Sequence, residues 1–155
     1  MTVADDFRSR TDRAGAAEAD IRRQIDRMVE GLRAKDPAAL RRLYTPDVVS
    51  FDVEPPLQHV GIAAKLENWS KVFSFFESLT YEFRELSVTA GDEVAFVHAF
   101  GRLSGTLTNG VVTSGMWVRA TLGMRRIDGV WLIAHDQVSV PFDLASGKGV
   151  ADLEP

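Results

Sequence analysis

Hydrophobic residues recur at helical spacing along the first part of the chain. Charged residues separate them, which predicts an amphipathic helix with one buried face. The buried positions are Ile21, Ile25, Met28, Val29 and Leu32. The preceding residues 1–16 are polar, and they either extend this helix or fray.

A second, short helix is predicted to begin after residue 36. Asp36 is a good capping residue, and Pro37 suits the first helical position because its missing N–H costs nothing there. We expect Pro46 to end this helix. Its apolar side is formed by Leu40, Leu43 and Tyr44.

A strand at 48–53 and a loop at 54–61 follow, since Pro55-Pro56 cannot lie inside a sheet. The next segment predicts a third helix because apolar residues again return at helical spacing. Its apolar face is formed by Ile62, Leu66, Trp69, Phe73 and Phe76.

The chain after Thr80 has the composition of strands, and these are expected at 81–88, 94–107, 111–127 and 130–140. Asn109-Gly110 and Asp128-Gly129 join the last three strands into a meander, because both dipeptides favour two-residue hairpin turns. Glycines inside these long strands indicate bends, so we expect the sheet to curl.

Helices followed by a strand meander are typical of an α+β fold. We therefore predict a cone-shaped, strongly curved antiparallel sheet wrapped around three N-terminal helices, with an enclosed pocket. The 155 residues suit one domain. Its ordered core is expected at 18–145, with flexible N-terminal and C-terminal ends.

Composition narrows the function classes. The chain has no cysteine, so it has neither disulfides nor thiolate metal sites. Its formal charge of −4 and the lack of a basic stripe argue against nucleic-acid binding. The polar N-terminus is unlike a secretory signal, and no apolar run is long enough to span a bilayer. We expect a cytoplasmic protein that binds neither membranes nor nucleic acid.

Two-residue turns at the hairpins would fix which residues are neighbours across the sheet. The first hairpin pairs Arg102 with Trp117, Phe100 with Arg119 and His98 with Thr121, and the second places Asp136 beside Thr121. The resulting face mixes aromatic and charged residues, as a ligand pocket does. It contains Phe96, His98, Phe100, Arg102, Trp117, Arg119, Thr121, Asp136 and Val138.

The opposite face is mostly small and apolar, and we expect it to pack against a second subunit in a homodimer. It contains Ala95, Val97, Ala99, Val118, Ala120, Leu122, Trp131, Ile133, His135 and Gln137. A bulge in either hairpin would exchange some of these positions, and His135 would then replace Asp136 in the pocket.

Several of these side chains also have a purely structural interpretation. Arg119 and Asp136 could form a structural ion pair, and Trp69 and Phe73 could be plain core. The candidate ligand contacts are Tyr44, Trp69, Phe73, Phe100, Trp117, Thr121 and His135. The three histidines do not cluster at the spacing of a zinc site, so we expect neither a metal nor another cofactor.

Five stretches of the chain resemble the nuclear transport factor 2-like superfamily, and within it the SnoaL-like proteins described as ketosteroid isomerase homologues. They are residues 34–38 (AKDPA), 44–48 (YTPDV), 52–61 (DVEPPLQHVG), 102–106 (RLSGT) and 131–142 (WLIAHDQVSVPF). The resemblance covers residues 18–145 and is more specific for the fold than for the reaction.

Ketosteroid isomerases use an Asp as base, with a tyrosine and a protonated acid stabilising the enolate. The resemblance implies that Asp52 occupies the position of the base. Met28 falls on the position of the tyrosine, and Leu122 or Gly123 falls on the position of the second acid. None of these residues can donate the hydrogen bond that the family's residue donates. The base is therefore expected without the usual oxyanion hole.

Three functions remain open from the sequence. In the first, the protein is a cofactor-independent isomerase, cyclase, dehydratase or hydrolase. Asp52 is then the general base, His98 or Asp136 an acid/base partner, and Arg119 an anchor for an oxyanion. In the second, the same pocket only binds a small molecule. In the third, the chain is a dimerising scaffold, and Asp52 merely hydrogen-bonds nearby backbone.

Overall fold

The computed structural model describes residues 2–155. Its elements in chain order are α1 (Val3–Arg33), α2 (Pro37–Arg41), β1 (Tyr44–Phe51), β2 (His59–Val60), α3 (Ile62–Phe75), β3 (Phe76–Ala90), β4 (Val94–Leu107), β5 (Val112–Ile127), β6 (Val130–Ser139), β7 (Phe142–Asp143) and β8 (Lys148–Gly149). Within the described residues, no helix has the length and apolar character needed to cross a membrane.

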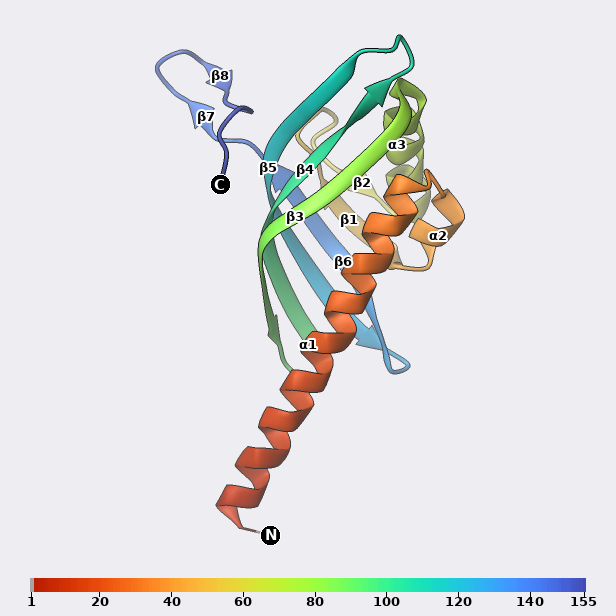
Figure 1. The fold of residues 1–155 in the computed structure, drawn as a ribbon. Coiled ribbons are helices and arrows are strands. Elements are labelled where there is room, and N and C mark those ends of the chain that lie inside the picture. The colour runs from red at the N-terminus through yellow and green to blue at the C-terminus, as the bar shows by residue number, and fades with distance from the viewer. Residues whose placement is uncertain (1) are drawn as a thin grey trace.

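Six strands form one strongly curved sheet in the order β2-β1-β6-β5-β4-β3, and the helices lie on its concave side (Figure 1). This confirms the predicted α+β fold. One pairing differs from the prediction: β1 runs parallel to β6, so the sheet is mixed. The strands β7 and β8 form a separate small hairpin near the C-terminus.

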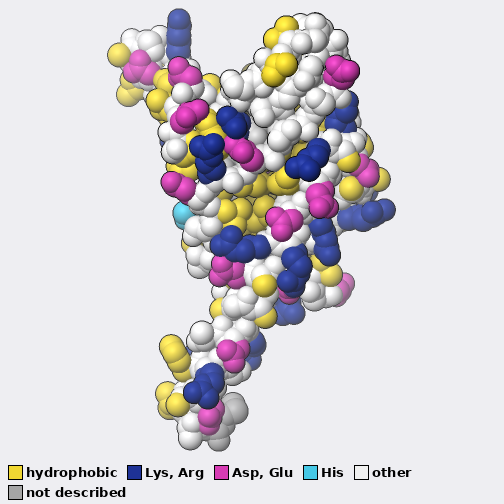
Figure 2. Space-filling model, viewed as in Figure 1, with side chains coloured by type: hydrophobic (Ala, Val, Ile, Leu, Met, Phe, Trp, Pro, Cys, Tyr) yellow, Lys and Arg dark blue, Asp and Glu magenta, His cyan; other side chains and the backbone are white. Residues whose placement is uncertain are grey.

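The helix α1 is long, and only its second half is covered by the sheet. Buried positions begin at Ile21 and continue through Ile25, Met28 and Leu32, as the apolar pattern predicts. Residues before Ala16 extend the helix beyond the sheet instead of packing on it (Figure 1). In the space-filling view, this part projects from the body and carries scattered charged side chains (Figure 2).

The second helix is shorter than predicted. Asp36 caps it by accepting hydrogen bonds from the backbone N–H groups of Ala38 and Ala39, but the helix ends at Arg41. Tyr44 already begins β1, so Pro46 lies inside a strand rather than at a helix end. The pairing of β1 with β6 is irregular between Tyr44 and Val49, which accommodates a proline without an N–H.

The register of the β4–β5 hairpin agrees with the prediction over most of its length. Arg102 pairs with Trp117, Phe100 with Arg119 and His98 with Thr121. A shift between Leu103 and Gly105 changes the pairing only near the turn.

The two faces of this hairpin are the reverse of the prediction. The small apolar residues Ala95, Val97 and Leu122 are buried in the core under the helices, whereas His98 and Arg119 are exposed on the convex, outer face. The physical reason is that the helices need an apolar surface to pack on, and this requirement takes precedence over a mixed face. The small apolar face is therefore not available to a second subunit.

A bulge in the β5–β6 hairpin decides the orientation of Asp136. The register shifts between Gly123 and Met124, so Asp136 pairs with Leu122 and not with Thr121. Asp136 consequently points into the molecule, where it is 6% exposed, and His135 takes the outward position. The pairing predicted for Asp136 from an unbulged hairpin was wrong by one residue.

Candidate active site

Asp52 follows the last residue of β1 and lies at the wall of an internal cavity. Val48 and Ser50 are fully buried on the same side of the strand, and alternation brings Asp52 to that side as well. Its side chain is 19% exposed. Its Oδ2 accepts a hydrogen bond of 2.8 Å from Nδ2 of Asn68 on α3.

Lys65, on the first turns of α3, connects Asp52 to the sheet. Its Nζ lies 3.5 Å from Oδ2 of Asp52 and 3.0 Å from Oδ2 of Asp136. The same Nζ donates to Oγ of Ser50 at 2.7 Å, and Ser50 in turn donates to Oδ1 of Asp136. We call Ser50, Asp52, Lys65 and Asp136 the buried polar cluster.

The electrostatics of this cluster explain its geometry. Lys65 is only 3% exposed, and a buried ammonium group is tolerated only when it is paired and hydrogen-bonded. Two carboxylates and one hydroxyl provide these partners. The ammonium group in turn holds Asp52 and Asp136 in fixed positions at the end of the cavity.

His59 contributes a nearby imidazole. Its Nε2 lies 3.8 Å from Oδ2 of Asp52, which is beyond hydrogen-bonding distance, and that nitrogen is buried without a hydrogen-bond partner among the described residues. Among residues 2–155, no three His, Asp or Glu side chains gather as the ligands of a metal ion would.

The cavity beside the cluster has a volume of about 150 Å³ and a mostly apolar wall. Helices α1 and α3 and strands β1, β3, β4, β5 and β6 all contribute to it. The lining residues are Met28, Tyr44, Asp52, Val53, Glu54, Lys65, Asn68, Trp69, Val72, Tyr81, Phe83, Leu103, Met116, Val118, Ala120, Leu122, Asp136 and Val138.

Two tyrosine hydroxyls belong to this wall. Burial raises the pKa of Tyr44 well above its ordinary value, and the charge of Asp136 raises it further. The pKa of Tyr81 is also raised, first by burial and then by Asp136 and Asp52. Both hydroxyls therefore stay protonated at neutral pH and can donate hydrogen bonds. The Tyr44 hydroxyl donates to Sδ of Met28 at 3.7 Å, and the nearby indole of Trp69 offsets part of the rise in its pKa.

The structure brings together four of the residues that the sequence nominated. Asp52, Asp136, Tyr44 and Trp69 all line the cavity. Phe73 does not reach it, and stacks on Trp69 with ring centroids 5.8 Å apart.

The other nominated residues lie on the outer face, away from the cavity. His98, Phe100 and Thr121 point to the convex side, and Arg119 donates to Oγ of Ser139 at 3.2 Å and to the carbonyl of Val140 at 3.1 Å. The prediction that Arg119 and His98 reach Asp52 was wrong, because it depended on the inverted assignment of the two sheet faces.

Trp117 and His135 also belong to the outer side. The ring of Trp117 is covered by the guanidinium groups of Arg84 and Arg102, at 4.4 Å and 5.0 Å. His135 has its Nδ1 2.7 Å from the carbonyl oxygen of Val49, and its ring meets that of Phe51 edge to face. Both side chains are therefore structural contacts of the sheet rather than parts of the cavity.

Sequence reasoning missed Ser50, His59, Lys65, Asn68 and Tyr81. A signal existed for Lys65, because it lies three residues after Ile62 and four before Trp69, within the apolar stripe of α3. Ser50 lies two residues before Asp52 and therefore on the same face of the strand. A charged or polar residue within an apolar stripe indicates a buried partner, and both positions could have been singled out.

The chain belongs to the SnoaL-like domain family, whose model matches residues 21–143, within the nuclear transport factor 2-like superfamily. A nuclear transport factor 2-like protein of unknown function from Pseudomonas putida is similar over 92% of this chain and 99% of its own, with 30% identity and a TM-score of 0.82. The comparison with curated proteins found no match.

Two further solved structures have the same fold. A ketosteroid isomerase-like protein from Erwinia carotovora shares 25% identity over 78% of this chain and 93% of its own, with a TM-score of 0.65. A proposed scytalone dehydratase from Novosphingobium aromaticivorans shares 15% identity over 83% and 86%, with a TM-score of 0.73.

Proposed function

We propose that the protein is a cofactor-independent isomerase or lyase that acts on a small organic molecule, with Asp52 as the general base. The observation that carries the proposal is the position of Asp52, a partly buried carboxylate at the wall of an apolar cavity that also presents two protonated tyrosine hydroxyls. This combination suits the removal of a proton next to a carbonyl group.

The proposed chemistry assigns one task to each group. Asp52 takes a proton from carbon, and the electron pair moves onto the carbonyl oxygen as an enolate. The hydroxyl of Tyr81 or Tyr44 donates a hydrogen bond to that oxygen. The proton then returns to another carbon in an isomerisation, or leaves with a β-hydroxyl group as water in a dehydration.

The buried polar cluster would position the base. Lys65 holds the carboxylate of Asp52 and is itself held by Asp136 and Ser50. Asp136 is then a positioning residue, and the anchoring task expected of Arg119 passes to Tyr81 or Tyr44. The names of two structural neighbours, a ketosteroid isomerase-like protein and a proposed scytalone dehydratase, are in line with this reaction class.

Hydrogen–deuterium exchange tests the proposal without knowledge of the natural substrate. Cyclohexanone and a panel of small cyclic ketones are incubated with the protein in D2O, and loss of the α-proton signal is followed by NMR. Asp52→Asn should lower the protein-dependent exchange rate by about 100-fold or more. Asp92→Asn, which changes an exposed carboxylate in the β3–β4 turn, is the matched control.

The same experiment separates the alternatives. Ketone binding without exchange in either form would identify a non-catalytic binding module instead of an enzyme. A dimerising scaffold with a filled pocket is less well supported. A pocket filled by Phe96, Phe100, Trp69 and Trp117 would favour the scaffold, but of these only Trp69 lines the cavity, and the other three lie on the outer face.

We also propose that a second copy of the chain covers the outer face of the sheet. Phe96 is 50% exposed there, beside the exposed side chains of His98 and Thr121. An exposed aromatic side chain beside polar residues is a common anchor of a protein interface.

A further inference from the structure

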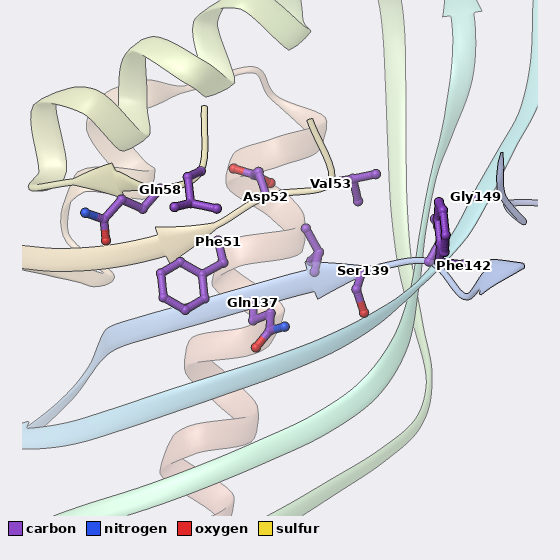
Figure 3. A pocket seen from close by; sticks show the side chains of 11 residues that line it. Phe51, Asp52, Val53, Gln58, Gln137, Ser139, Phe142 and Gly149 are labelled. Carbon is purple, nitrogen blue, oxygen red and sulfur yellow. The ribbon is translucent and has the colours of Figure 1, made fainter. Parts of the chain in front are cut away.

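A second hollow lies immediately outside the cavity. It is a groove of about 750 Å³ between the segment after β1, the end of β6 and the β7–β8 hairpin (Figure 3). Asp52, Val53 and Val138 line both the groove and the cavity. The two spaces therefore meet at the carboxylate to which the proposed function assigns proton removal.

The sizes of the two spaces imply that different parts of the substrate occupy the cavity and the groove. A cavity of about 150 Å³ accommodates roughly one six-membered ring. Small-molecule sites are generally larger, on the order of 300–1,000 Å³. A substrate whose reactive ring reaches Asp52 must therefore leave any longer part outside the cavity, and the groove is the adjoining space.

The wall of the groove defines the chemistry of that longer part. Its apolar surface includes Phe51, Leu57, Val140 and Phe142. Figure 3 shows Gln137 and Ser139 on β6 along the same groove.

Of the described residues that line the groove, Asp52 is the one ionisable side chain. Gln58, Gln137 and Ser139 supply neutral donors and acceptors. None of these described lining side chains is a cation, and the nearby guanidinium of Arg119 is already hydrogen-bonded to Ser139 and Val140. A phosphate or carboxylate on the substrate would therefore approach Asp52 without a dedicated partner. An uncharged chain that carries an amide or hydroxyl group would find both apolar contact and hydrogen bonds.

We propose that the groove is a subsite for the uncharged tail of a substrate whose ring-sized reactive head occupies the cavity. This inference rests on the proposed function, because it assigns the remainder of the molecule that Asp52 deprotonates. It predicts that a neutral tail binds in preference to a phosphorylated or otherwise anionic one.

Three probes of graded structure test the subsite by isothermal titration. Cyclohexanone represents the head alone. 4-(4-Oxocyclohexyl)butanamide adds a neutral tail, and 4-(4-oxocyclohexyl)butanoate adds a tail of the same size with a negative charge. We expect the amide to bind about tenfold more tightly than cyclohexanone and than the carboxylate.

A variant in the groove locates the tail. Phe142 is largely exposed, so Phe142→Ala leaves the core intact. Within this variant, the advantage of the amide over cyclohexanone should fall below about threefold. Phe7→Ala removes a comparably exposed phenyl ring on α1 that does not line the groove, and should keep the full advantage.

The inference is overturned if the amide has no advantage, if the carboxylate gains as much, if none of the probes binds, or if Phe142→Ala keeps the advantage. If the tighter binding of the amide disappears at protein concentrations where copies of the chain associate, the groove is a contact between copies. That result also overturns the inference. Amide preference without deuterium exchange would refute the proposed function alone, and exchange without amide preference would refute only the subsite.

Discussion

Lys65 is the residue on which the organisation of the site depends. It is buried, and its ammonium group contacts Ser50 and Asp52 at the end of β1 and Asp136 on β6, two places far apart in the chain. The sequence shows a lysine within an apolar stripe, but not which carboxylates surround it. Asp136 reaches it only because a bulge in β6 turns that side chain inward. The residues near Asp52 could thus be found from sequence in part, and their pairing could not.

Removing the lysine tests this view of the cluster. Lys65→Met leaves two carboxylates without a cation, and we expect the free energy of unfolding to fall by about 3–5 kcal/mol in urea titrations. Lys71→Met, which removes an exposed lysine paired with Glu67 on the same helix, should change it by less than about 1 kcal/mol.

A double variant provides the second check. Adding Asp136→Asn to Lys65→Met removes one of the two unpaired carboxylates. Asp136→Asn should therefore lower the free energy of unfolding less in the Lys65→Met background than in the wild type. Additive effects of the two substitutions would show that Lys65 and Asp136 do not interact in solution.

The buried tyrosines predict a particular dependence of stability on pH. Burial raises the pKa of Tyr44 in the folded protein above the value of about 10 in the unfolded chain. Above pH 10, the unfolded chain therefore loses a proton that the folded protein keeps, and the free energy of unfolding should fall as pH rises. Tyr44→Phe should reduce this alkaline slope by up to about 1.4 kcal/mol per pH unit in urea titrations between pH 8 and pH 11.5. An unchanged slope would contradict the assigned burial of the hydroxyl.

Strands and helices were predicted more reliably than the directions in which their side chains point. The boundaries of β4 and α3 agree with the apolar pattern within one residue. The face that each strand presents depends on bulges and on the helices that cover the sheet. Small apolar residues on β4 and β5 form a core surface here, although the same pattern would suit an interface between subunits.

A glycine in β4 shows how the sheet makes room for the cavity wall. A methyl group at Gly101 would collide with the ring and hydroxyl of Tyr81 on the neighbouring strand. Gly101→Ala should therefore displace Tyr81 and lower the free energy of unfolding by about 1–3 kcal/mol, measured by thermal and urea denaturation.

The same substitution elsewhere should act in the opposite direction. Gly15 lies in the exposed half of α1 with open space around it, so Gly15→Ala should stabilise the protein by up to about 1 kcal/mol. Equal effects at both positions would show that Tyr81 does not pack against Gly101.

At the scale of the whole molecule, the curved sheet separates two surfaces with different tasks. The concave side is filled by helices and keeps a small cavity, and the convex side exposes Phe96 and Arg119. Sequence reasoning recognised the fold because the element order and the hairpin dipeptides are local properties. It could not assign inside and outside, since that choice depends on which face the helices cover.

The proposed homodimer gives a prediction at this scale. Light scattering after size-exclusion chromatography should show a dimer, and Phe96→Glu should raise its dissociation constant by at least about tenfold, because a charge would be buried at the contact. Phe7→Glu makes the same change at an exposed position on α1 and should leave the dimer unaffected. A wild-type protein that remains monomeric at every concentration would refute the proposal.

The parallel pairing of β1 with β6 has a consequence for the order of assembly. Ser50 and Asp52 are synthesised early and Lys65 soon afterwards, but the strand that carries Asp136 is the last of the main sheet. On the ribosome, the emerging lysine has no carboxylate from β6 until almost the entire chain has been made. The pairing of β1 with β6 is therefore the step that completes the buried polar cluster. Contacts so distant along the chain form slowly.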